Sequence, residues 1–426
     1  MDSVTLSGKL LLLSSEVRRM AISKVTTGRH KGEYIVRVQP RNPVTKKRMS
    51  IPVQYAKTKR KAEQLQAKII TQVNTGFDYD QADMLVGECL SQFIQKQKVQ
   101  RGWAERTYKA WLNTLGIVNE YFARVRMKQI NEDVMRTFAR KFISDRKLSI
   151  GPNSVIGRVL VHLHAFFDKY VGAVYKRNPV PRGPINAFFK EEEQTLKKER
   201  YTLSKVEVGQ LIRAIKDGLD MDNPLVCVTR LAIWVDTLTG MRPQELQALR
   251  WSNLVGDDKN GYYFHIDDAW SDVSKKLNGH LKKRKHGESR DTPPISNELK
   301  EYLDRYHEAQ VAYLDSKMIV NENDFIFLNL NDYQKATAGF PVCQTSLNEM
   351  LKRLGDQIGI DTDLKWSLYS LRHTVATTLA NDPDVPYPWA AQVLGHTVQI
   401  FMKTYVHVTD EVDGQMRSKI GQNGIF

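Results

Sequence analysis

A proline- and glycine-rich segment divides the sequence into parts that we expect to fold separately. From position 178 to 184 the chain reads Asn-Pro-Val-Pro-Arg-Gly-Pro, and a continuous helix cannot run through prolines at this density. The segment is preceded by a region with helical spacing and followed by a charged run. We therefore expect a helical domain at residues 76–180, a linker at 181–200 and a further domain at 201–426. A chain of 426 residues also exceeds what one core usually supports.

The region before this segment is predicted to be all-α. Its longest apolar series recurs at intervals of about three and four residues: Trp111, Leu112, Leu115, Val118, Tyr121 and Phe122. This spacing is typical of one buried helix face.

Residues 1–75 show a different pattern, in which strands are followed by a helix. Alternation at Tyr34–Val38 and at Arg48–Val53 flanks a turn near Pro40–Pro43, and helical spacing follows at residues 59–73. We expect a two- or three-stranded ribbon backed by one helix. Basic side chains on the strands and turn suit contact with DNA, although each would equally suit a solvated hairpin tip: Arg37, Arg41, Lys46, Lys47 and Arg48.

The net charge of +15 is concentrated in this N-terminal region. Residues 1–75 hold 16 Lys and Arg against four Asp and Glu, which accounts for +12. Such a surplus favours a polyanionic partner, either nucleic acid or an anionic membrane surface, unless the region is only a disordered basic tail.

The cysteines and the apolar runs give only weak signals about the location of the protein. Cys89, Cys227 and Cys343 fit neither a metal site nor a disulfide framework, which indicates a reducing compartment. The apolar run Leu10–Leu13 is far shorter than a signal-peptide core or the ~20 residues of a membrane span. We expect a cytoplasmic protein that does not enter a membrane.

The third region opens with a capping box at Ser204 and Glu207. Beyond this helix start, only residues 262–267 and 281–295 look extended. The region is therefore predicted to be mainly α with one small sheet.

A second helix start places an arginine where it could bind an anion. In Thr239-Gly-Met-Arg-Pro-Gln-Glu245, Gly240 permits a turn and Pro243 suits the first helical position. Arg242 is then expected beside free backbone N–H groups, a suitable cradle for phosphate. Taken alone this signal is weak, because arginines at helix starts are common.

Three more boxes follow in the same region. Leu371-Arg-His-Thr374 opens an amphipathic helix, Leu394-Gly-His396 comes next, and Tyr405 lies nine residues after that histidine. Together with the box around Arg242, and in this order, they resemble the tyrosine recombinases, and the phage integrases of the lambda type most closely. The resemblance covers the last ~225 residues strongly; the earlier regions match only in position and character.

The resemblance implies a three-part protein that cuts and rejoins DNA. Residues 1–75 would form an arm-binding domain, 76–180 an α-helical core-binding domain, and 201–426 a mainly α catalytic domain with a small antiparallel sheet. Cleavage would form a 3′-phosphotyrosine and a free 5′-hydroxyl, with no ATP, metal or other cofactor. The covalent link conserves bond energy for rejoining.

The resemblance also assigns roles. Tyr405 would be the nucleophile, Arg242 and Arg372 the clamp on the scissile phosphate, and His396 a hydrogen-bond partner of that phosphate. Glu245 and His373 also belong to the boxes, and we expect them to support these residues by hydrogen bonding, although each would equally suit a helix start.

The family's active-site lysine lies on a β-hairpin between the two arginine boxes. Within Lys282-Lys-Arg-Lys-His-Gly287 we expect Lys285 to be this general acid, because it directly precedes the turn at His286-Gly287. Lys283 is the alternative.

One position departs from the family pattern. The family usually has histidine three residues before the second arginine, and this chain has Tyr369. A phenol can donate to a phosphate oxygen, but with an ordinary pKa of ~10 it carries protons poorly near neutrality. Tyr369 is therefore expected either to position the phosphate or merely to pack.

The implied task is integration and excision of a phage or other mobile element in a bacterial host. The partners would be double-stranded DNA at core and arm sites, three further copies in a tetramer, an excisionase and a DNA-bending host protein. Two alternatives remain: a chromosome-dimer resolvase, which resembles this chain but lacks a basic N-terminal ribbon, and a noncatalytic DNA-binding protein derived from a recombinase.

Overall fold

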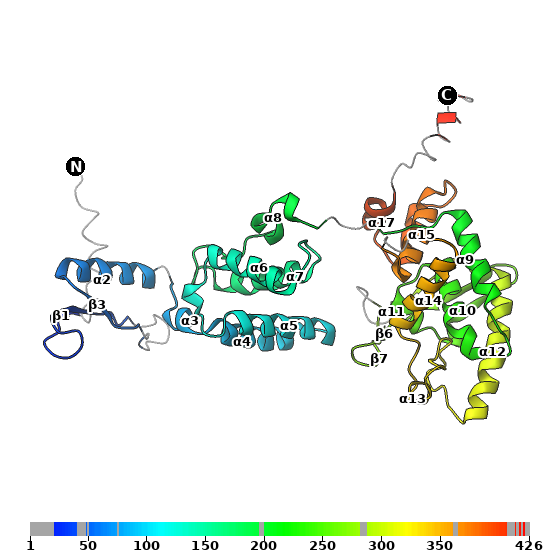
Figure 1. The fold of residues 1–426 in the computed structure, drawn as a ribbon, viewed down its shortest axis with the longest axis horizontal. Helices are drawn as coiled ribbons and strands as arrows, with labels where there is room; N and C mark the ends of the chain where they lie inside the picture. Colours follow the sequence, from blue (N-terminus) through cyan, green and yellow to red (C-terminus); the bar gives the residue numbers. More distant parts are fainter. Residues whose placement is uncertain are drawn as a thin grey trace, which may run out of the picture. The chain divides into compact units, whose positions relative to one another are not determined.

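The computed structural model describes residues 21–40, 48, 51–74, 76–195, 200–281, 288–360 and 365–406, with residues 414, 417, 418 and 421. Contacts along the chain divide it into two compact units, Met1–Lys197 and Lys198–Phe426 (Figure 1). Among the described residues, no helix is both long enough and apolar enough to cross a membrane.

The first unit begins with a three-stranded antiparallel sheet in the order β1-β2-β3. Its elements are β1 (Ala21–Lys24), β2 (Tyr34–Arg37) and β3 (Gln54–Ala56), followed by helix α2 (Lys59–Asn74). In the central strand, Ile35 pairs with Ser23 on one side and Tyr55 on the other. Val36 points the opposite way and is buried together with Ala62 and Ile69 of α2. One face of the sheet therefore packs on the helix, as the sequence predicts.

The strands themselves differ from the prediction in two places. The expected strand at residues 48–53 is displaced, because β3 starts at Gln54. Pro52 lacks the N–H that a strand ladder requires, which explains a start beyond it. The sequence pattern also missed β1, a strand that begins directly at the edge of the described chain.

The rest of the first unit is helical, with α3 (Tyr79–Asp83), α4 (Val86–Arg101), α5 (Glu105–Tyr121), α6 (Glu132–Arg146), α7 (Val155–Phe167) and α8 (Pro184–Phe188). Short 3-10 turns occur at Met127–Gln129, Asp168–Tyr170 and Glu191–Glu193. The predicted apolar face of α5 is buried at Trp111 and Val118, and Phe122 directly after the helix is buried too. Leu112 was predicted to be buried on this face, and this prediction is wrong: it lies one position off the stripe and is 36% exposed.

The segment predicted to be a linker is partly folded onto these helices. Pro184 occupies the first position of α8, where a missing N–H costs nothing, so the prolines begin a helix here. Phe188 and Phe189 are buried in the helical core. The guanidinium groups of Arg136 and Arg140 lie over the rings of these two phenylalanines, 5.1 and 5.4 Å from the ring centres. The core of the first unit therefore extends to Phe189.

The second unit is mainly helical. Its helices are α9 (Lys205–Asp217), α10 (Pro224–Thr239), α11 (Pro243–Gln247), α12 (Asn297–Lys317), α13 (Tyr333–Thr337), α14 (Gln344–Gln357), α15 (Leu368–Asn381), α16 (Tyr387–Leu394) and α17 (Val398–Tyr405), with a 3-10 turn at Trp251–Asn253. The predicted capping box opens α9: Ser204 Oγ accepts from the N–H of Glu207, and the Glu207 carboxylate accepts from the N–H of Ser204.

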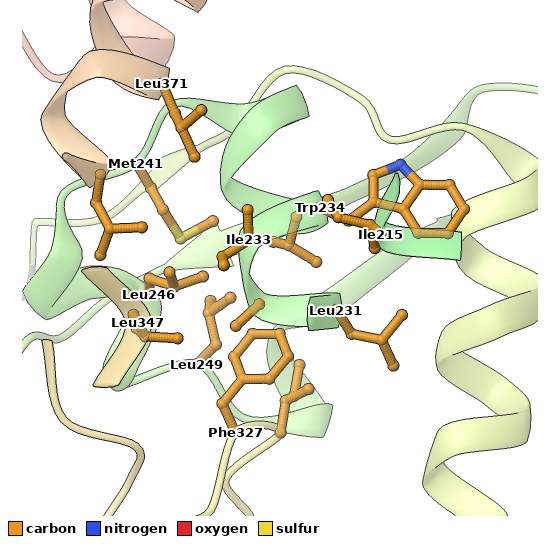
Figure 2. Close-up of a cluster of buried hydrophobic side chains, with 14 of the residues drawn as sticks. Ile215, Leu231, Ile233, Trp234, Met241, Leu246, Leu249, Phe327, Leu347 and Leu371 are labelled. Carbon is orange, nitrogen blue, oxygen red and sulfur yellow. The ribbon is translucent and has the colours of Figure 1, made fainter. Parts of the chain in front are cut away.

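Helix α10 lies inside the core of this unit. Leu231, Ile233 and Trp234 are buried on different sides of it, and Figure 2 shows them among side chains from α11, α14 and α15. A helix that is apolar all round must be surrounded by other elements. Its C-terminal end is thereby held rigidly, and the box around Arg242 begins there.

Small sheets complete the second unit. β4 (Leu254–Asp257), β5 (Gly261–Ile266) and β8 (Arg290–Asp291) form an antiparallel sheet in that order, and β6 (Trp270–Ser271) pairs with β7 (Lys276–Leu277). The extended segment predicted at residues 262–267 is confirmed as β5, whereas β4, β6 and β7 were not predicted. Together these elements form the mainly helical fold with small sheets that the sequence predicts.

Candidate active site

The turn between α10 and α11 presents Arg242 at a helix start. Gly240 ends α10 in the left-handed conformation, with φ of 57°, and a Cβ there would lie 2.9 Å from the side chain of Val375. Arg242 then precedes Pro243 as the N-cap of α11. Glu245 binds Arg242 twice: its carboxylate accepts from the Arg242 N–H at 2.9 Å and from Nη1 at 2.8 Å. Backbone and guanidinium of Arg242 are thus fixed by one carboxylate.

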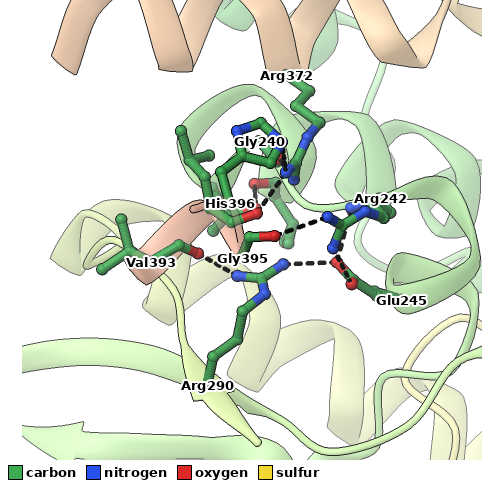
Figure 3. A network of polar contacts seen from close by, with 11 residues as sticks. Gly240, Arg242, Glu245, Arg290, Arg372, Val393, Gly395 and His396 are labelled. Atoms are coloured by element: carbon green, nitrogen blue, oxygen red, sulfur yellow. Dashed lines mark hydrogen bonds and ion pairs between the residues drawn. The ribbon is translucent and has the colours of Figure 1, made fainter. Parts of the chain in front are cut away.

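Glu245 also binds a second arginine, Arg290 of β8. Both side chains are 1% exposed, and Nη2 of Arg290 donates to Oε2 of Glu245 at 2.5 Å. Arg290 Nη1 donates to the carbonyl of Val393 near the end of α16 (Figure 3). Burial opposes ionisation of Glu245, but Arg290, Arg242 and Arg372 outweigh it and lower the pKa of this carboxyl to about 2. Glu245 therefore stays charged at neutral pH.

Arg372 connects three parts of the second unit from the first turns of α15. It is 3% exposed, and its Nη1 donates to the carbonyl of Gly240 at 2.7 Å. Nη2 donates to the carbonyl of Leu394 and to Nε2 of His396, the latter at 2.9 Å. Burial, assisted by the like charge of Arg242, lowers the pKa of Arg372 to about 10, so the guanidinium remains protonated near neutrality.

His396 is held as a neutral ring. Burial, followed by the charge of Arg372, lowers its pKa to about 3. Because Nε2 accepts from Arg372, the proton of the neutral ring belongs on Nδ1. Nδ1 is buried and has no hydrogen-bond partner among the described residues. A donor is therefore left over at this position, and a buried unused donor in a native structure calls for a partner such as a bound anion.

A glycine allows the backbone to pass close to the arginines. Gly395 ends α16 with φ of 64°, and a Cβ there would lie 3.0 Å from Nε of Arg290 and 3.2 Å from Nη1 of Arg242. Its carbonyl accepts from Nη2 of Arg242 at 2.9 Å (Figure 3). The Leu394-Gly-His396 box thus contacts both arginine boxes through its backbone.

Tyr405 lies beside His396 at the end of α17. The two rings are stacked, with centres 5.6 Å apart and 7° between the planes. The ring of His373 meets Tyr405 edge-on at 5.1 Å. Burial raises the pKa of the Tyr405 phenol, while Arg372, Arg200 and Arg242 act in the opposite direction. The four boxes of the sequence therefore meet at one place, where the guanidinium groups of Arg242 and Arg290 bind the ionised carboxylate of Glu245.

This convergence coincides with a match to a known family. The profile of the Phage integrase family matches residues 201–412, which span the whole site. The chain belongs to this family of tyrosine recombinases.

Similar proteins come from transposons and phage. Transposase A from transposon Tn554 of Staphylococcus aureus is 27% identical over 217 residues, which cover 50% of this chain and 51% of that protein. The chain thus spans about half the length of the curated relatives that it matches.

Solved structures share the fold. The integrase of transposon Tn1549, in complex with transposon right end DNA, has a TM-score of 0.57 at 16% identity and covers 79% of this chain and 100% of its own. A lambda integrase dimer bound to a COC′ core site has a TM-score of 0.52 at 15% identity, covering 91% and 94%. At such low identities these likenesses show the tyrosine recombinase fold alone.

The structure describes only some of the other residues that were expected to act on DNA. Lys285 and its alternative Lys283 lie outside the described residues. Tyr369 is half-buried on α15, where its ring faces the guanidinium of Arg200 at 5.1 Å. Of the expected arm-domain residues, Arg37 on β2 and Arg48 are exposed, whereas Arg41, Lys46 and Lys47 lie outside the described residues.

Three residues near the recombinase site were missed by the sequence reasoning. Arg290 is one of many basic residues in its stretch, and only its position before Thr292-Pro293 on a buried strand distinguishes it. Asp236 is fully buried in α10, and burial raises the pKa of its carboxyl well above the usual range. The one available signal was an acidic residue inside an otherwise apolar helix. Arg200 had no signal beyond its charge.

Proposed function

We propose that this chain is a site-specific DNA recombinase that moves a mobile element by cutting and rejoining DNA through Tyr405. The observation that carries the proposal is the meeting of Tyr405 with Arg242, Arg372 and neutral His396 in one buried site. A noncatalytic protein derived from a recombinase would not need these four residues to remain together. The similarity to transposase A supports a role in moving a mobile element.

The residues fit the chemistry of phosphoryl transfer to a phenol. A phosphodiester repels nucleophiles, so fixed bidentate cations are the largest expected aid to its transition state. Arg242 and Arg372 would bind the non-bridging oxygens, and the unused Nδ1–H of His396 would donate to one of them. The bond from phosphorus to the Tyr405 oxygen forms while the bond to the 5′-oxygen breaks. The phenol releases its proton to water, and Lys285 supplies one to the leaving 5′-oxygen.

The larger assembly is part of the same proposal. A structure of lambda integrase is a tetramer bound to a Holliday junction, with a TM-score of 0.51 to this chain. Strand exchange requires two cut duplexes held together, so we infer that four copies act on core sites. The exposed Arg37 and the basic residues around it would bind separate arm sites by neutralising phosphates. Excision would then depend on an excisionase and a DNA-bending host protein.

Covalent trapping tests the proposal and does not require the target sequence to be known. The full chain is incubated with a pool of duplexes that share a randomised central segment containing one nick. Cleavage near the nick releases a short strand, so covalent adducts accumulate and survive detergent. The wild-type chain is expected to enrich one DNA sequence among its covalent adducts, the selected duplex. Tyr405→Phe is expected to form no adduct. No adduct from the wild-type chain on this pool or on the DNA that flanks its gene would contradict the proposal.

A further inference from the structure

Tyr369 and Arg200 form a contact at the edge of the active site that the proposed chemistry does not yet use. The Arg200 guanidinium lies over the Tyr369 ring, 5.1 Å from its centre. Tyr369 precedes Arg372 by three residues on α15, so the two side chains leave neighbouring parts of the same helix turn. A cation is thus stacked where the family usually places a histidine.

The backbone holds Arg200 in place. Arg200 forms an isolated β-bridge with Lys365, and the N–H of Tyr201 donates to the Lys365 carbonyl at 3.4 Å. The Tyr201 ring also packs edge-on against Trp366, 6.0 Å between centres. The half-buried Arg200 is therefore anchored to the segment that leads into α15, and its position follows that of Tyr369.

The charge of Arg200 has no counterion in the described part of the chain, because no carboxylate there lies within salt-bridge distance of it. Comparable arginines in the first unit are paired: Arg140 with Glu193 at 2.8 Å and Arg136 with Glu132 at 2.9 Å. An anchored cation that no described carboxylate neutralises can act on another negative group.

The group of this site that becomes negative during attack is the phenol of the proposed nucleophile, Tyr405. Burial raises the pKa of Tyr405, and among the charges that oppose this rise Arg372 comes first and Arg200 next, ahead of Arg242. The other groups that face Tyr405 are His373 from α15 and His396 from the turn between α16 and α17.

We propose that Arg200 is a further cation of the recombinase site, positioned by the ring of Tyr369, and that it stabilises the negative charge on the Tyr405 oxygen during attack. The proposal rests on the proposed function. It gives Tyr369 a role that needs only its ring: the aromatic face holds a guanidinium, which supplies a positive charge where the family's histidine usually stands. No additional bond is made or broken.

The test measures single-turnover cleavage of the selected duplex between pH 6 and 10. The duplex carries sulfur in place of the 5′-bridging oxygen, so that the leaving group needs no proton and the rate reports on the nucleophile. Arg200→Ala is expected to slow cleavage roughly tenfold at pH 7, since one unit in the pKa of a phenol changes its ionised fraction tenfold. The deficit should shrink toward pH 10. Arg200→Lys should keep most of the rate.

Matched variants separate this role from a structural one. Lys205→Ala removes an exposed charge five residues away and should cleave like the wild type. Tyr369→Phe keeps the ring and should remain active, whereas Tyr369→Leu should show the same pH-dependent deficit as Arg200→Ala. The double variant Arg200→Ala with Tyr369→Leu should be no slower than either single variant, because both remove one interaction.

A deficit of Arg200→Ala that is equal at every pH would overturn the inference, as would full activity of this variant or an equal loss in Lys205→Ala. In each of these cases the wild-type chain still cleaves, so the proposed function stands. A wild-type chain that forms no adduct contradicts the proposed function itself. Thermal unfolding of each variant confirms that it is folded before its rate is compared.

Discussion

The Arg372 guanidinium on α15 donates at 2.9 Å to Nε2 of His396, which lies in the turn between α16 and α17. This bond fixes which nitrogen of His396 accepts and leaves the other ring nitrogen, Nδ1, as the donor. It also means that protonation of His396 would place two cations in contact. Acid should therefore lower both the stability of the fold and the activity of the site by protonating His396 beside Arg372.

Stability should fall with acid through His396. Its pKa is about 3 in the folded chain against an ordinary 6.5, so the unfolded chain binds the proton first as the pH drops. Stability from this group is complete above about pH 6.5 and is lost as the pH falls toward 3. Between pH 7.5 and 5 the loss should be about 2 kcal/mol at most. Thermal unfolding of His396→Asn should show a smaller acid shift than the wild type; equal shifts would contradict the assignment.

Tyr405→Phe should abolish cleavage and leave DNA binding intact, because only the nucleophilic oxygen is lost. Detergent-resistant adducts on the selected duplex measure the first property, and gel mobility shift measures the second. If the Phe variant still formed an adduct, the nucleophile would be a residue other than Tyr405. Tyr387→Phe, a tyrosine on neighbouring α16, is the control and should cleave normally.

Lys285→Ala should slow cleavage of the ordinary selected duplex by roughly 10²- to 10⁴-fold, as expected for a lost general acid. Sulfur in place of the 5′-bridging oxygen should restore the rate, since a thiolate leaves without a proton. Lys283→Ala should show neither effect. If Lys283 shows this pattern and Lys285 does not, the roles of the two lysines are exchanged.

Arg290→Met should destabilise the second unit by about 3 to 5 kcal/mol, because Glu245 would remain buried with one fewer cation. Denaturant unfolding measures this change. The control is Lys335→Met, which breaks the exposed pair with Asp332 and should leave stability nearly unchanged, because solvent screens such a pair. Similar small effects in both variants would show that Glu245 does not depend on Arg290.

Removal of residues 1–75 should flatten the salt dependence of DNA binding while core-site cleavage persists. Each phosphate that the chain no longer neutralises lowers the slope of log K against log salt by ~0.9. Binding titrations at several salt concentrations measure this slope for the full and truncated chains. An unchanged slope together with normal integration would rule out the arm-binding role.

Local signals predicted much of the fold around the site. The capping box at Ser204 and the position of Arg242 before Pro243 are set by neighbouring residues, and both are confirmed. Arg290 could not be found this way, because its burial depends on Glu245 and on Val393, 103 residues away. The end of the helical core was also misplaced, since a proline looks the same in sequence whether it ends a domain or starts α8.

Arg290 also limits the reach of the expected proton donor. Both terminal nitrogens of its guanidinium are bound, to Val393 and to Glu245, so β8 is anchored beside the arginine clamp. Lys285 is five residues before it, and five residues of extended chain span at most about 18 Å. A general acid at Lys285 would therefore keep its backbone within that distance of Arg290, so the anchor that holds the clamp together would also limit how far this acid could travel.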